Sequence, residues 1–431
     1  TNGITTDRVV YCRKPVKSPE EEGAMLDQLL VKQVRRRVEA AGLPVAVELW
    51  NGERVGAHDA AAVRIRLHQP ASLKAMADPS LGSLARAYVE GHLDLEGDVR
   101  DILALGDRLC NAGECKPKTG SDGWKWWRHT RSKDRKNIQY HYDVSNDFYG
   151  LWLDTRRVYS CAYFKDPEMS LDAAQEAKLD HICRKLALKP GERFLDIGCG
   201  WGGLVLHAAE RYGVDAVGIT LSDDQHAYVS EQIASRGLVG RVEVRRMDYR
   251  DVPELGSYDK IASVGMFEHV GRINLAAYFE KIHTLLKPGG LVLNHGITTA
   301  TPDAAGLGGG ISEFIEDYVF PGGELVHAHE VFRAAAGSGL ECLDAENLRP
   351  HYARTLWHWV TRLEQHSETA RRLIGEQKYR IWRIYMAGSA HAFDRGWMEL
   401  WQVLAGKGIE GSQPNYPFSR DHIYTDSAPV A

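Results

Sequence analysis

The sequence predicts a doubly wound, mostly parallel α/β sheet that follows a small N-terminal α+β domain. Strand and helix patterns alternate between residues 193 and 295, which is typical of a parallel sheet with helical crossovers. A glycine-rich turn, Asp196-Ile-Gly-Cys-Gly-Trp-Gly-Gly203, follows the first of these strands. Polar residues follow the next two strands, and parallel strands bring their carboxyl ends to one edge of a sheet. That edge is the expected ligand site.

Length, charge and cysteine content limit the classes of protein. A chain of 431 residues is too long for one small core and predicts two domains. The formal charge of -5 argues against a general nucleic-acid binder. Seven dispersed cysteines without a common zinc spacing favour a reducing cytoplasm, and no metal site is expected. We see no signal-peptide pattern and no apolar run of about eighteen residues, so we expect a cytoplasmic protein without a membrane span.

The first domain is predicted to cover residues 1–115. The spacing of apolar residues predicts a helix from Met25 to Ala41, which Gly42 would end. Residues 44–58 read as two strands around an Asn-Gly turn, and residues 63–67 alternate as a half-buried strand. Two or three helices are expected from there to about Leu109.

Residues 116–136 form a basic, tryptophan-bearing linker. This stretch carries eight Lys or Arg, two Asp and three Trp. One interpretation is a solvated hinge whose tryptophans pack between domains, because charge runs are usually soluble surface. The other is contact with a membrane surface, since tryptophan prefers the headgroup level and basic side chains attract anionic lipid.

The second domain is predicted to cover residues 137–431. The expected strands are 193–197, 214–219, 241–246, 259–264 and 290–295, and the expected helices are 203–212, 223–236 and 275–286. Residues 298–345 read as an insertion with helices and a glycine-rich loop. Residues 353–406 read as helical and rich in tryptophan and tyrosine.

The pattern around the glycine turn favours S-adenosylmethionine over a dinucleotide. The turn reads D-x-G-x-G and lacks the glycine spacing of a dinucleotide fingerprint. Asp248-Tyr249, after the third strand, is placed to bind an adenine amine and ring. The second strand ends without an acidic residue, so the ribose hydroxyls would be bound by Thr220, Ser222 or Gln225.

Several longer motifs resemble the cyclopropane-fatty-acyl-phospholipid synthases and the related mycolic acid cyclopropane synthases. The matching stretches are Gln139–Tyr149, Tyr159–Phe164, Phe194–Gly203, Gly218–Gln225, Ser263–Gly271, Asn294–Ile297 and Leu400–Gln402. The resemblance implies a seven-stranded Rossmann-like methyltransferase sheet. The first domain resembles the N-terminal domain of the bacterial phospholipid-acting members, which the mycolic enzymes lack. The phospholipid-acting branch therefore fits better.

The resemblance also implies which residues bind S-adenosylmethionine. They are Tyr159, Ser160, Asp196, Gly198, Cys199, Gly200, Trp201, Gly202, Thr220, Leu221, Ser222, Gln225, Asp248 and Tyr249. Read alone, Cys199 would more often be a small buried apolar residue. Tyr159 and Tyr163 fit either the core or the lining of the pocket.

A bound bicarbonate is a further implication of the resemblance. It would be held by Cys161, Glu268, His295, the backbone of Ile297, and Tyr352. Methyl transfer to an olefin leaves a carbocation, which aromatic faces stabilise and from which water must be kept. Ring closure then needs a base, a role that fits bicarbonate. Read singly, Cys161 could be core, His295 a structural histidine and Glu268 a helix cap.

The expected activity is transfer of a methylene group from S-adenosylmethionine to the cis double bond of a phospholipid acyl chain. The alternatives are a methyl- or methylene-branched product, or a lipid-binding protein without turnover. The resemblance implies a homodimer, peripheral contact with membrane phospholipids at the inner face of the membrane, and no nucleic acid. Two departures from the family stand out: Ser389 lies where members commonly carry a cysteine, and the loop from Thr298 to Gly310 is unusually rich in glycine and alanine.

Overall fold

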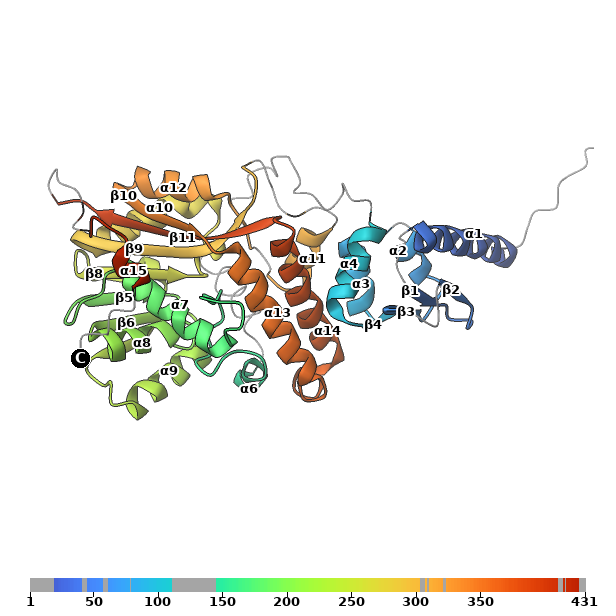
Figure 1. Ribbon diagram of the computed structural model, residues 1–431, viewed down its shortest axis with the longest axis horizontal. Helices are drawn as coiled ribbons and strands as arrows, with labels where there is room; N and C mark the ends of the chain where they lie inside the picture. The colour runs from blue at the N-terminus through green and yellow to red at the C-terminus, as the bar shows by residue number, and fades with distance from the viewer. Residues whose placement is uncertain are drawn as a thin grey trace, which may run out of the picture.

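The structure is a computed structural model, and it describes residues 19–40, 45–56, 61–77, 79–110, 145–302, 307, 310–320, 323–409, 414 and 416–425. Within them the chain forms a small N-terminal domain beside a larger α/β domain (Figure 1). The predicted linker at 116–136 and the predicted start of the second domain at residue 137 lie outside the described residues.

The N-terminal domain is a four-stranded sheet with helices. Its elements are α1 (Pro19–Ala40), β1 (Val45–Glu48), β2 (Arg54–Gly56), β3 (Val63–Leu67), α2 (Ser72–Ala77), α3 (Leu81–Val89), β4 (Leu93–Gly97) and α4 (Val99–Leu109). The strand order is β2-β1-β3-β4. The predicted first helix, the two strands around the Asn-Gly turn and the alternating strand are confirmed. Strand β4 was not predicted, and it pairs antiparallel with β3.

The larger domain contains the predicted parallel sheet. Its elements are α6 (Asn146–Gly150), α7 (Leu171–Lys185), β5 (Arg193–Ile197), α8 (Gly203–Tyr212), β6 (Asp215–Thr220), α9 (Asp223–Ser235), β7 (Val242–Arg246), η1 (Tyr249–Asp251), β8 (Tyr258–Val264), η2 (Phe267–His269), η3 (Arg272–Asn274), α10 (Leu275–Leu285), β9 (Leu286–Thr299), α11 (Ile311–Tyr318), α12 (Ala328–Gly337), β10 (Leu340–Asn347), α13 (Arg349–Gln365), α14 (Ser367–Asp394), β11 (Met398–Lys407) and α15 (Asp421–Tyr424).

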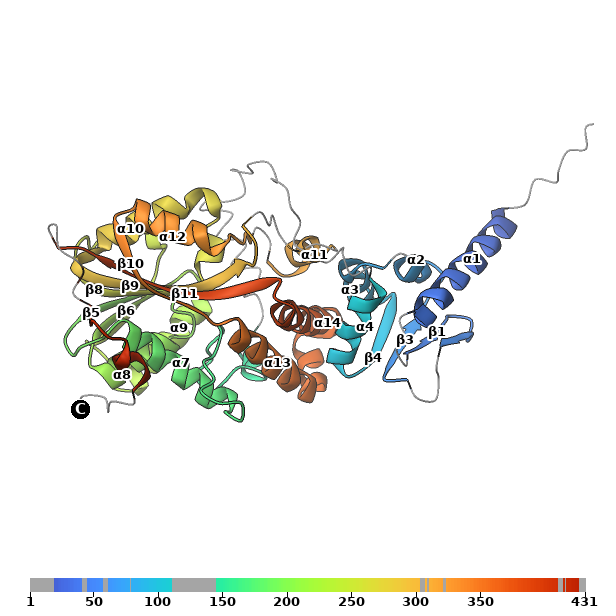
Figure 2. The ribbon, with the colours of Figure 1, turned by 45° about the horizontal axis from the view of Figure 1, so that its top comes forward.

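The seven strands have the order β10-β11-β9-β8-β5-β6-β7. Neighbours from β9 to β7 pair in parallel, whereas β11 pairs antiparallel with both β9 and β10. Helices α10 and α12 cover one face of the sheet, and α7, α8 and α9 cover the other (Figures 1 and 2). The predicted doubly wound, mostly parallel fold is confirmed. Helices α13 and α14 extend beyond one end of the sheet toward the N-terminal domain.

The prediction of helix throughout residues 353–406 is wrong at its end. Helix α14 ends at Asp394, and residues 398–407 form β11. Gly396, with φ of +68°, takes the left-handed conformation that ends the helix. Both faces of β11 are largely buried between β9 and β10, so it shows no simple alternation of apolar and polar residues. Strand β10, which begins within the predicted insertion at 298–345 and extends to Asn347, was not predicted.

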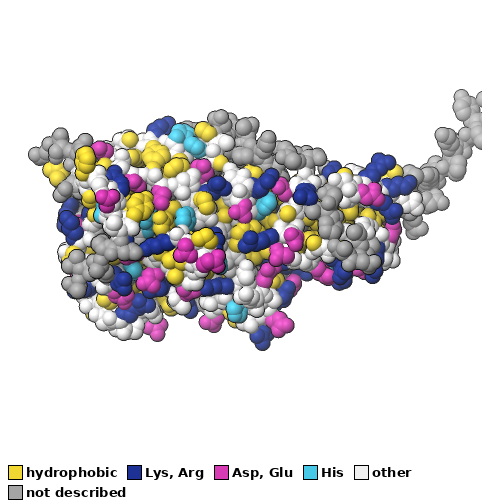
Figure 3. All heavy atoms as spheres, in the orientation of Figure 1, with side chains coloured by type: hydrophobic (Ala, Val, Ile, Leu, Met, Phe, Trp, Pro, Cys, Tyr) yellow, Lys and Arg dark blue, Asp and Glu magenta, His cyan; other side chains and the backbone are white. Residues whose placement is uncertain are grey.

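The surface carries charges of both signs. Lys and Arg side chains are interspersed with Asp and Glu side chains over the face shown in Figure 3. Among the described residues, no helix is long and apolar enough to cross a membrane.

Candidate active site

The glycine turn after β5 brings the backbone to the carboxyl edge of the sheet. Gly198, Gly200 and Gly202 have φ of +82°, +55° and +81°, which glycine adopts without steric cost. A Cβ added at Gly200 would have no described atom within 4 Å beyond its chain neighbours, so the turn borders open space there. The amides of Gly198 and Cys199 both donate to the carbonyl oxygen of Ile219 at 3.0 Å. This fixes the turn against β6.

A pocket of about 1210 Å³, counting its open mouth, lies over the turn. It is lined by most of the predicted cofactor-binding residues, namely Tyr159, Ser160, Asp196, Gly198, Cys199, Gly200, Trp201, Thr220, Leu221, Gln225, Asp248 and Tyr249. The other two predicted residues, Gly202 and Ser222, are not among the described residues that line the pocket. Gly202 is the N-cap of α8, and Ser222 is the N-cap of α9, where its Oγ accepts from the amide of Gln225 at 3.3 Å.

Hydroxyl and amide groups stand in place of an acid at the end of β6. Thr220 Oγ1 donates to Gln225 Oε1 at 2.7 Å and accepts from the amide of Ser222 at 3.1 Å. At the end of β7, Asp248 is held by Arg250. Its Oδ1 accepts from the backbone amide and Nε of Arg250 at 2.9 Å and 2.8 Å, and its Oδ2 accepts from Nη2 at 2.6 Å. The sequence did not predict that Arg250 orients this carboxylate.

Lys178 is a pocket residue that sequence reasoning missed. It lies on α7, its side chain is only 1% exposed, and its ammonium donates to Ser160 Oγ at 2.9 Å. Burial lowers the pKa of Lys178 to about 8, and burial raises the pKa of Asp196 to about 7, although Lys178 lowers it in part. Asp196 Oδ1 is buried without a hydrogen-bond partner among the described residues. A signal was available, because Lys178 shares a helical stripe with apolar Leu171.

The predicted catalytic residues gather beside the pocket, around the ends of β9 and β11. Glu268 Oε1 accepts from the backbone amide of Ile297 at 2.7 Å, while no described residue bonds to the buried Glu268 Oε2. His295 lies two residues before Ile297 on β9 and is 1% exposed. Gln402, its neighbour on β11, places Nε2 at 3.2 Å from His295 Nδ1. His295 Nε2 is buried and has no partner within the described part of the chain.

The charge states of Glu268 and His295 follow from burial. Burial raises the pKa of Glu268 to about 7, and the bond from Ile297 offsets part of this. Burial, together with nearby Lys178 and Lys185, holds the pKa of His295 well below its ordinary value. A neutral imidazole that accepts from Gln402 at Nδ1 carries its proton at Nε2. The site therefore holds one buried N–H donor and one carboxyl oxygen that no described residue engages.

Cys161 and Tyr352 both contact the backbone carbonyl group of Leu348, which places them near the same end of β11. The buried thiol of Cys161 donates to the carbonyl oxygen of Ala162 at 3.2 Å and lies 3.9 Å from that of Leu348. The Leu348 amide donates to Leu400, the partner of Ile297 on β11. Tyr352 stands one helical turn after Leu348 and donates its amide to the Leu348 carbonyl at 3.1 Å. Burial raises the pKa of the Cys161 thiol, which keeps it protonated.

Aromatic rings join the pocket to the catalytic residues. The Tyr159 ring, which lines the pocket, lies 5.3 Å from Trp359, and Trp359 lies 6.1 Å from Tyr352, both measured between ring centroids. Such faces stabilise positive charge and exclude water. Tyr163, which the sequence left between core and pocket, stacks on His181 at 4.1 Å and is not among the described residues that line the pocket.

The seven-stranded sheet, its glycine turn and the pocket above it define the class of S-adenosylmethionine-dependent methyltransferases. The chain belongs to the family described as mycolic acid cyclopropane synthetase, whose model matches residues 129–403. Residues 34–108 match the model of a domain of unknown function.

Relatives fall into two groups by the length they share with this chain. A probable fatty acid methyltransferase of Pseudomonas putida is 42% identical and covers 92% of this chain and 100% of its own length. Tuberculostearic acid methyltransferase UfaA1 of Mycobacterium tuberculosis is 32% identical and covers 90% of this chain and 93% of its own. Among solved structures, the chain in the crystal structure of mycolic acid cyclopropane synthase CmaA1 complexed with SAH and CTAB has 36% sequence identity to this one. It covers 63% of this chain and 98% of its own, with a TM-score of 0.60.

Proposed function

We propose that this chain transfers a methylene group from S-adenosylmethionine to the cis double bond of a phospholipid acyl chain and forms a cyclopropane ring. Membership of a lipid-modifying methyltransferase family supports the reaction class. The single observation that carries the proposal is the buried pair Glu268 Oε2 and His295 Nε2, neither of which bonds to a described residue. A polar pair of this kind beside a methyl-donor pocket suits the removal of a proton in an apolar surrounding.

The pocket residues fit S-adenosylmethionine. The buried Asp196 Oδ1, which no described residue engages, and the buried ammonium of Lys178 suit the ammonium and carboxylate of its methionine part. Thr220 and Gln225 suit the ribose hydroxyls, and Asp248, oriented by Arg250, suits the adenine amine. When bound, the cofactor supplies an electrophilic methyl group on a sulfonium.

The chain's own residues govern the steps after methyl transfer. The double-bond electrons form a bond to the methyl carbon as its bond to sulfur breaks, and a carbocation remains on the acyl chain. The rings of Tyr159, Trp359 and Tyr352 stabilise this charge and exclude water. Ring closure requires loss of a proton from the added methyl group, whose C–H electrons form the second carbon–carbon bond.

Glu268 and His295 also fit a bound bicarbonate. The protonated Nε2 of His295 is a donor, and Glu268, with its pKa near 7, is readily protonated. Neutral donors without protein partners suit a small anion in a buried site. The bicarbonate would accept the proton released in ring closure, and the Ile297 amide, already bonded to Glu268, would fix the carboxyl in place.

A second candidate product is a methyl- or methylene-branched acyl chain. It is favoured by two relatives that match at least 90% of this chain, one named a probable fatty acid methyltransferase and the other a tuberculostearic acid methyltransferase. Methyl transfer is common to both routes, and a proton is then lost in each. The C–H electrons close the ring in one route, and in the other they form a new C=C bond, either to the added carbon (a methylene branch) or within the chain (a methyl branch beside a double bond). A lipid-binding protein without turnover is the third alternative, although such a protein has no need of a buried proton-handling pair. We further propose that the protein acts as a homodimer in peripheral contact with phospholipid at the inner face of the membrane.

The test is to incubate the protein with S-adenosylmethionine and vesicles of an oleoyl phospholipid, and to analyse the lipid by mass spectrometry and proton NMR. A gain of CH2 with loss of olefinic protons and appearance of ring protons identifies a cyclopropane. A gain of CH2 with terminal methylene protons, or with a branch methyl beside a single remaining olefinic proton, identifies the branched product. An unchanged lipid, with cofactor binding intact, would leave the binding protein as the surviving alternative.

A further inference from the structure

A second, apolar cavity lies between the two domains. It encloses about 910 Å³, counting its opening. Its walls come from the N-terminal sheet and helices on one side and from α11, α14 and the start of β11 on the other. Residues from both sides line it, among them Ile65, Leu84, Ile102, Phe314, Tyr385 and Met398.

The lining selects the chemistry of the occupant. None of the described residues that line the cavity is Asp, Glu, Lys or Arg, and His391, which does line it, lies 3.5 Å from the carboxylate of Asp107. An occupant with charged or strongly polar groups along its length would lose hydration without gaining partners. A long hydrocarbon chain has no polar groups to desolvate, and moving its apolar surface out of water is favourable in free energy.

A glycine in the middle of α14 keeps the cavity open. Gly388 has no left-handed φ that would require glycine, and glycine is a poor helix former. A Cβ at this position would have no described atom within 4 Å outside its own helix, and the residue lines the cavity. A larger side chain at Gly388 would therefore extend into open space, so the small residue preserves cavity volume.

Side-chain contacts link the wall of the cavity to the wall of the cofactor pocket. Tyr385 on its wall lies 5.8 Å from the ring of Phe320, which in turn lies 5.7 Å from the ring of His269, a residue that lines the cofactor pocket. Met398, at the other end of the wall, is two residues before Leu400, the strand partner of Ile297. The cavity wall is thus linked, through packed rings and along β11, to the region where the predicted catalytic residues gather.

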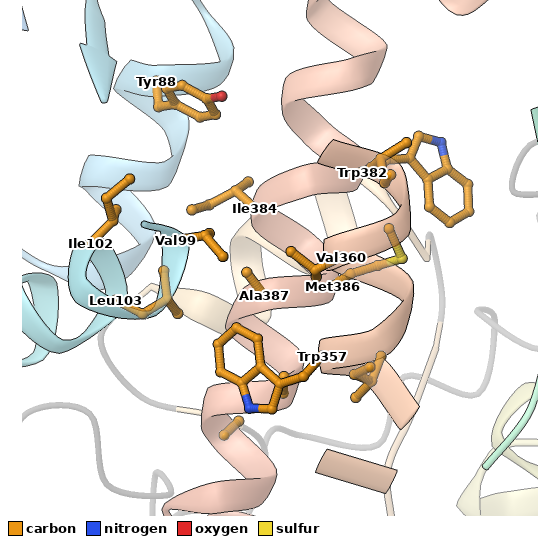
Figure 4. Close-up of a cluster of buried hydrophobic side chains, with 14 of the residues drawn as sticks. Tyr88, Val99, Ile102, Leu103, Trp357, Val360, Trp382, Ile384, Met386 and Ala387 are labelled. Atoms are coloured by element: carbon orange, nitrogen blue, oxygen red, sulfur yellow. The ribbon is translucent and has the colours of Figure 1, made fainter. Parts of the chain in front are cut away.

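The N-terminal wall is held in place by specific contacts. Arg380 on α14 donates to Asp94 at 2.6 Å and to the carbonyl oxygen of Tyr88 at 2.9 Å. Arg86 on α3 pairs with Asp317 on α11 at 2.7 Å. Figure 4 shows Val99, Ile102 and Leu103 of α4 facing Ile384 and Ala387 of α14. The two walls form one hydrophobic cluster.

We propose that this cavity binds the part of the substrate acyl chain that extends beyond the reacting double bond, so that the N-terminal domain helps to set the acyl length that is accepted. The inference rests on the proposed function, since it takes the substrate to be an acyl lipid. It assigns a binding role to the part of the wall that the N-terminal domain supplies, which lies before the residues 129–403 matched by the family model.

The test is Gly388→Leu, which fills the cavity from a site where an added Cβ meets no described atom. The matched control is Gly337→Leu on α12, where an added Cβ also has no described atom within 4 Å and the residue is exposed. Myristoleoyl and oleoyl lipids share the double-bond position and differ only in the length beyond it. We expect Gly388→Leu to lower methylation of the oleoyl lipid by about tenfold or more while the myristoleoyl lipid loses less than about twofold. The control variant should match the parent on both.

Equal losses on both lipids, or none on either, would overturn the cavity assignment. A binding assay separates this from failure of the proposed function. cis-Parinaric acid, a fluorescent long-chain fatty acid, should bind the parent protein and Gly337→Leu alike and bind Gly388→Leu about tenfold more weakly. If parinaric acid binds the three proteins as expected but no lipid is methylated, the proposed function is refuted and the cavity assignment stands. Equal binding by all three proteins, or binding by none, would refute the cavity assignment.

Discussion

Ile297 donates its backbone amide to Glu268 Oε1 at 2.7 Å, and this bond aims the second oxygen of the carboxyl into a buried space where no described residue bonds to it. The bond links η2, after β8, to β9, so two neighbouring strands of the sheet fix one carboxyl. His295 lies two residues earlier on β9, and its Nε2 is likewise buried without a hydrogen bond to any described residue. Buried polar groups without partners are costly, which favours a functional use for this pair.

Glu268→Gln and His295→Gln should lower turnover by about a hundredfold or more, because each alters a group that positions the bicarbonate, which accepts the proton released in ring closure. Binding of S-adenosylhomocysteine, measured by calorimetry, should stay near that of the parent. Glu231→Gln on the exposed surface of α9 is the matched control and should leave turnover unchanged. Added bicarbonate should partly restore a weakened variant. Full turnover in both variants would remove these residues and the anion from the mechanism.

The central strands were predictable because their signals are local. Residues 193–197 place Phe194, Leu195 and Ile197 just before a glycine turn, and β5 has these bounds. Strand β11 was read as helix because both its faces are buried, a property of its place between β9 and β10 and not of its composition. The register that brings Ile297 opposite Leu400 depends on that placement.

The same distinction holds for the site. The glycine turn and the residues after β6 and β7 lie together because parallel strands end at one edge, so the sequence located them. Lys178 shares a helical stripe with Leu171, which indicates burial, but only the tertiary fold places this stripe of α7 at the cofactor pocket, so the residue was missed. The cavity between the domains was also missed, because its walls join residues such as Ile65 and Met398 that only the tertiary fold brings together.

Asp248→Ala should weaken S-adenosylmethionine binding by about 1–3 kcal/mol, because it removes a charged acceptor that alanine cannot replace. Folding should survive. Arg250→Met should weaken binding by a smaller amount, because Asp248 keeps its charge but loses the side chain that holds both of its oxygens. Calorimetry with the cofactor measures both effects. Unchanged affinity in Asp248→Ala would show that the adenine is bound elsewhere.

Cofactor affinity should depend on pH through Asp196. Burial raises its pKa from 3.8 to about 7, so below that value the carboxyl must lose a proton to pair with the cofactor ammonium. Affinity for S-adenosylhomocysteine should therefore fall by up to about tenfold per pH unit below about 7. Asp196→Asn should bind weakly with little pH dependence, whereas Asp224→Asn on exposed α9 should behave as the parent. A parent affinity that does not vary between pH 5 and 7 would contradict this.

The stability of the cofactor-free protein should show the matching trend. The pKa of Asp196 in the folded state, about 7, lies above its ordinary value of 3.8. Between these two pH values the folded state therefore binds one proton that the unfolded state has released. This contribution to stability is fully present below about pH 4 and is lost as the pH rises through about 7. Asp196→Asn should flatten that part of the urea-unfolding profile. An identical slope in parent and variant would show that Asp196 does not titrate in this range.

A test of the basic linker distinguishes membrane contact from a solvated hinge. If the linker contacts anionic lipid, its charges should contribute to vesicle binding. Replacing Lys125, Arg128, Arg131 and Lys133 by Gln should weaken vesicle binding by at most about 1 kcal/mol per charge, because salt screens the sum. Activity on vesicles should fall with it, and activity on detergent-solubilised lipid should fall much less. Equal losses in the two assays would favour the hinge interpretation of the linker.

Arg380→Met should loosen the contact between the two domains. The variant loses the ion pair to Asp94 and the bonds to the carbonyl oxygens of Tyr88 and Leu93, at 2.6 Å, 2.9 Å and 3.2 Å. Since the Arg380 side chain is only 15% exposed, its bonds are poorly replaced by water, and we expect a loss of about 1–3 kcal/mol.

Calorimetric unfolding and limited proteolysis measure this loss. The control, Arg236→Met at the C-cap of α9, removes a surface ion pair to Glu210 and should change stability by less than about 1 kcal/mol. If the N-terminal domain forms one wall of the acyl cavity, Arg380→Met should also narrow the difference between oleoyl and myristoleoyl lipids as substrates, because a loosened wall no longer fixes the cavity. A variant with parent-like stability and an unchanged ratio of the two substrates would show that the arginine contacts do not hold that wall.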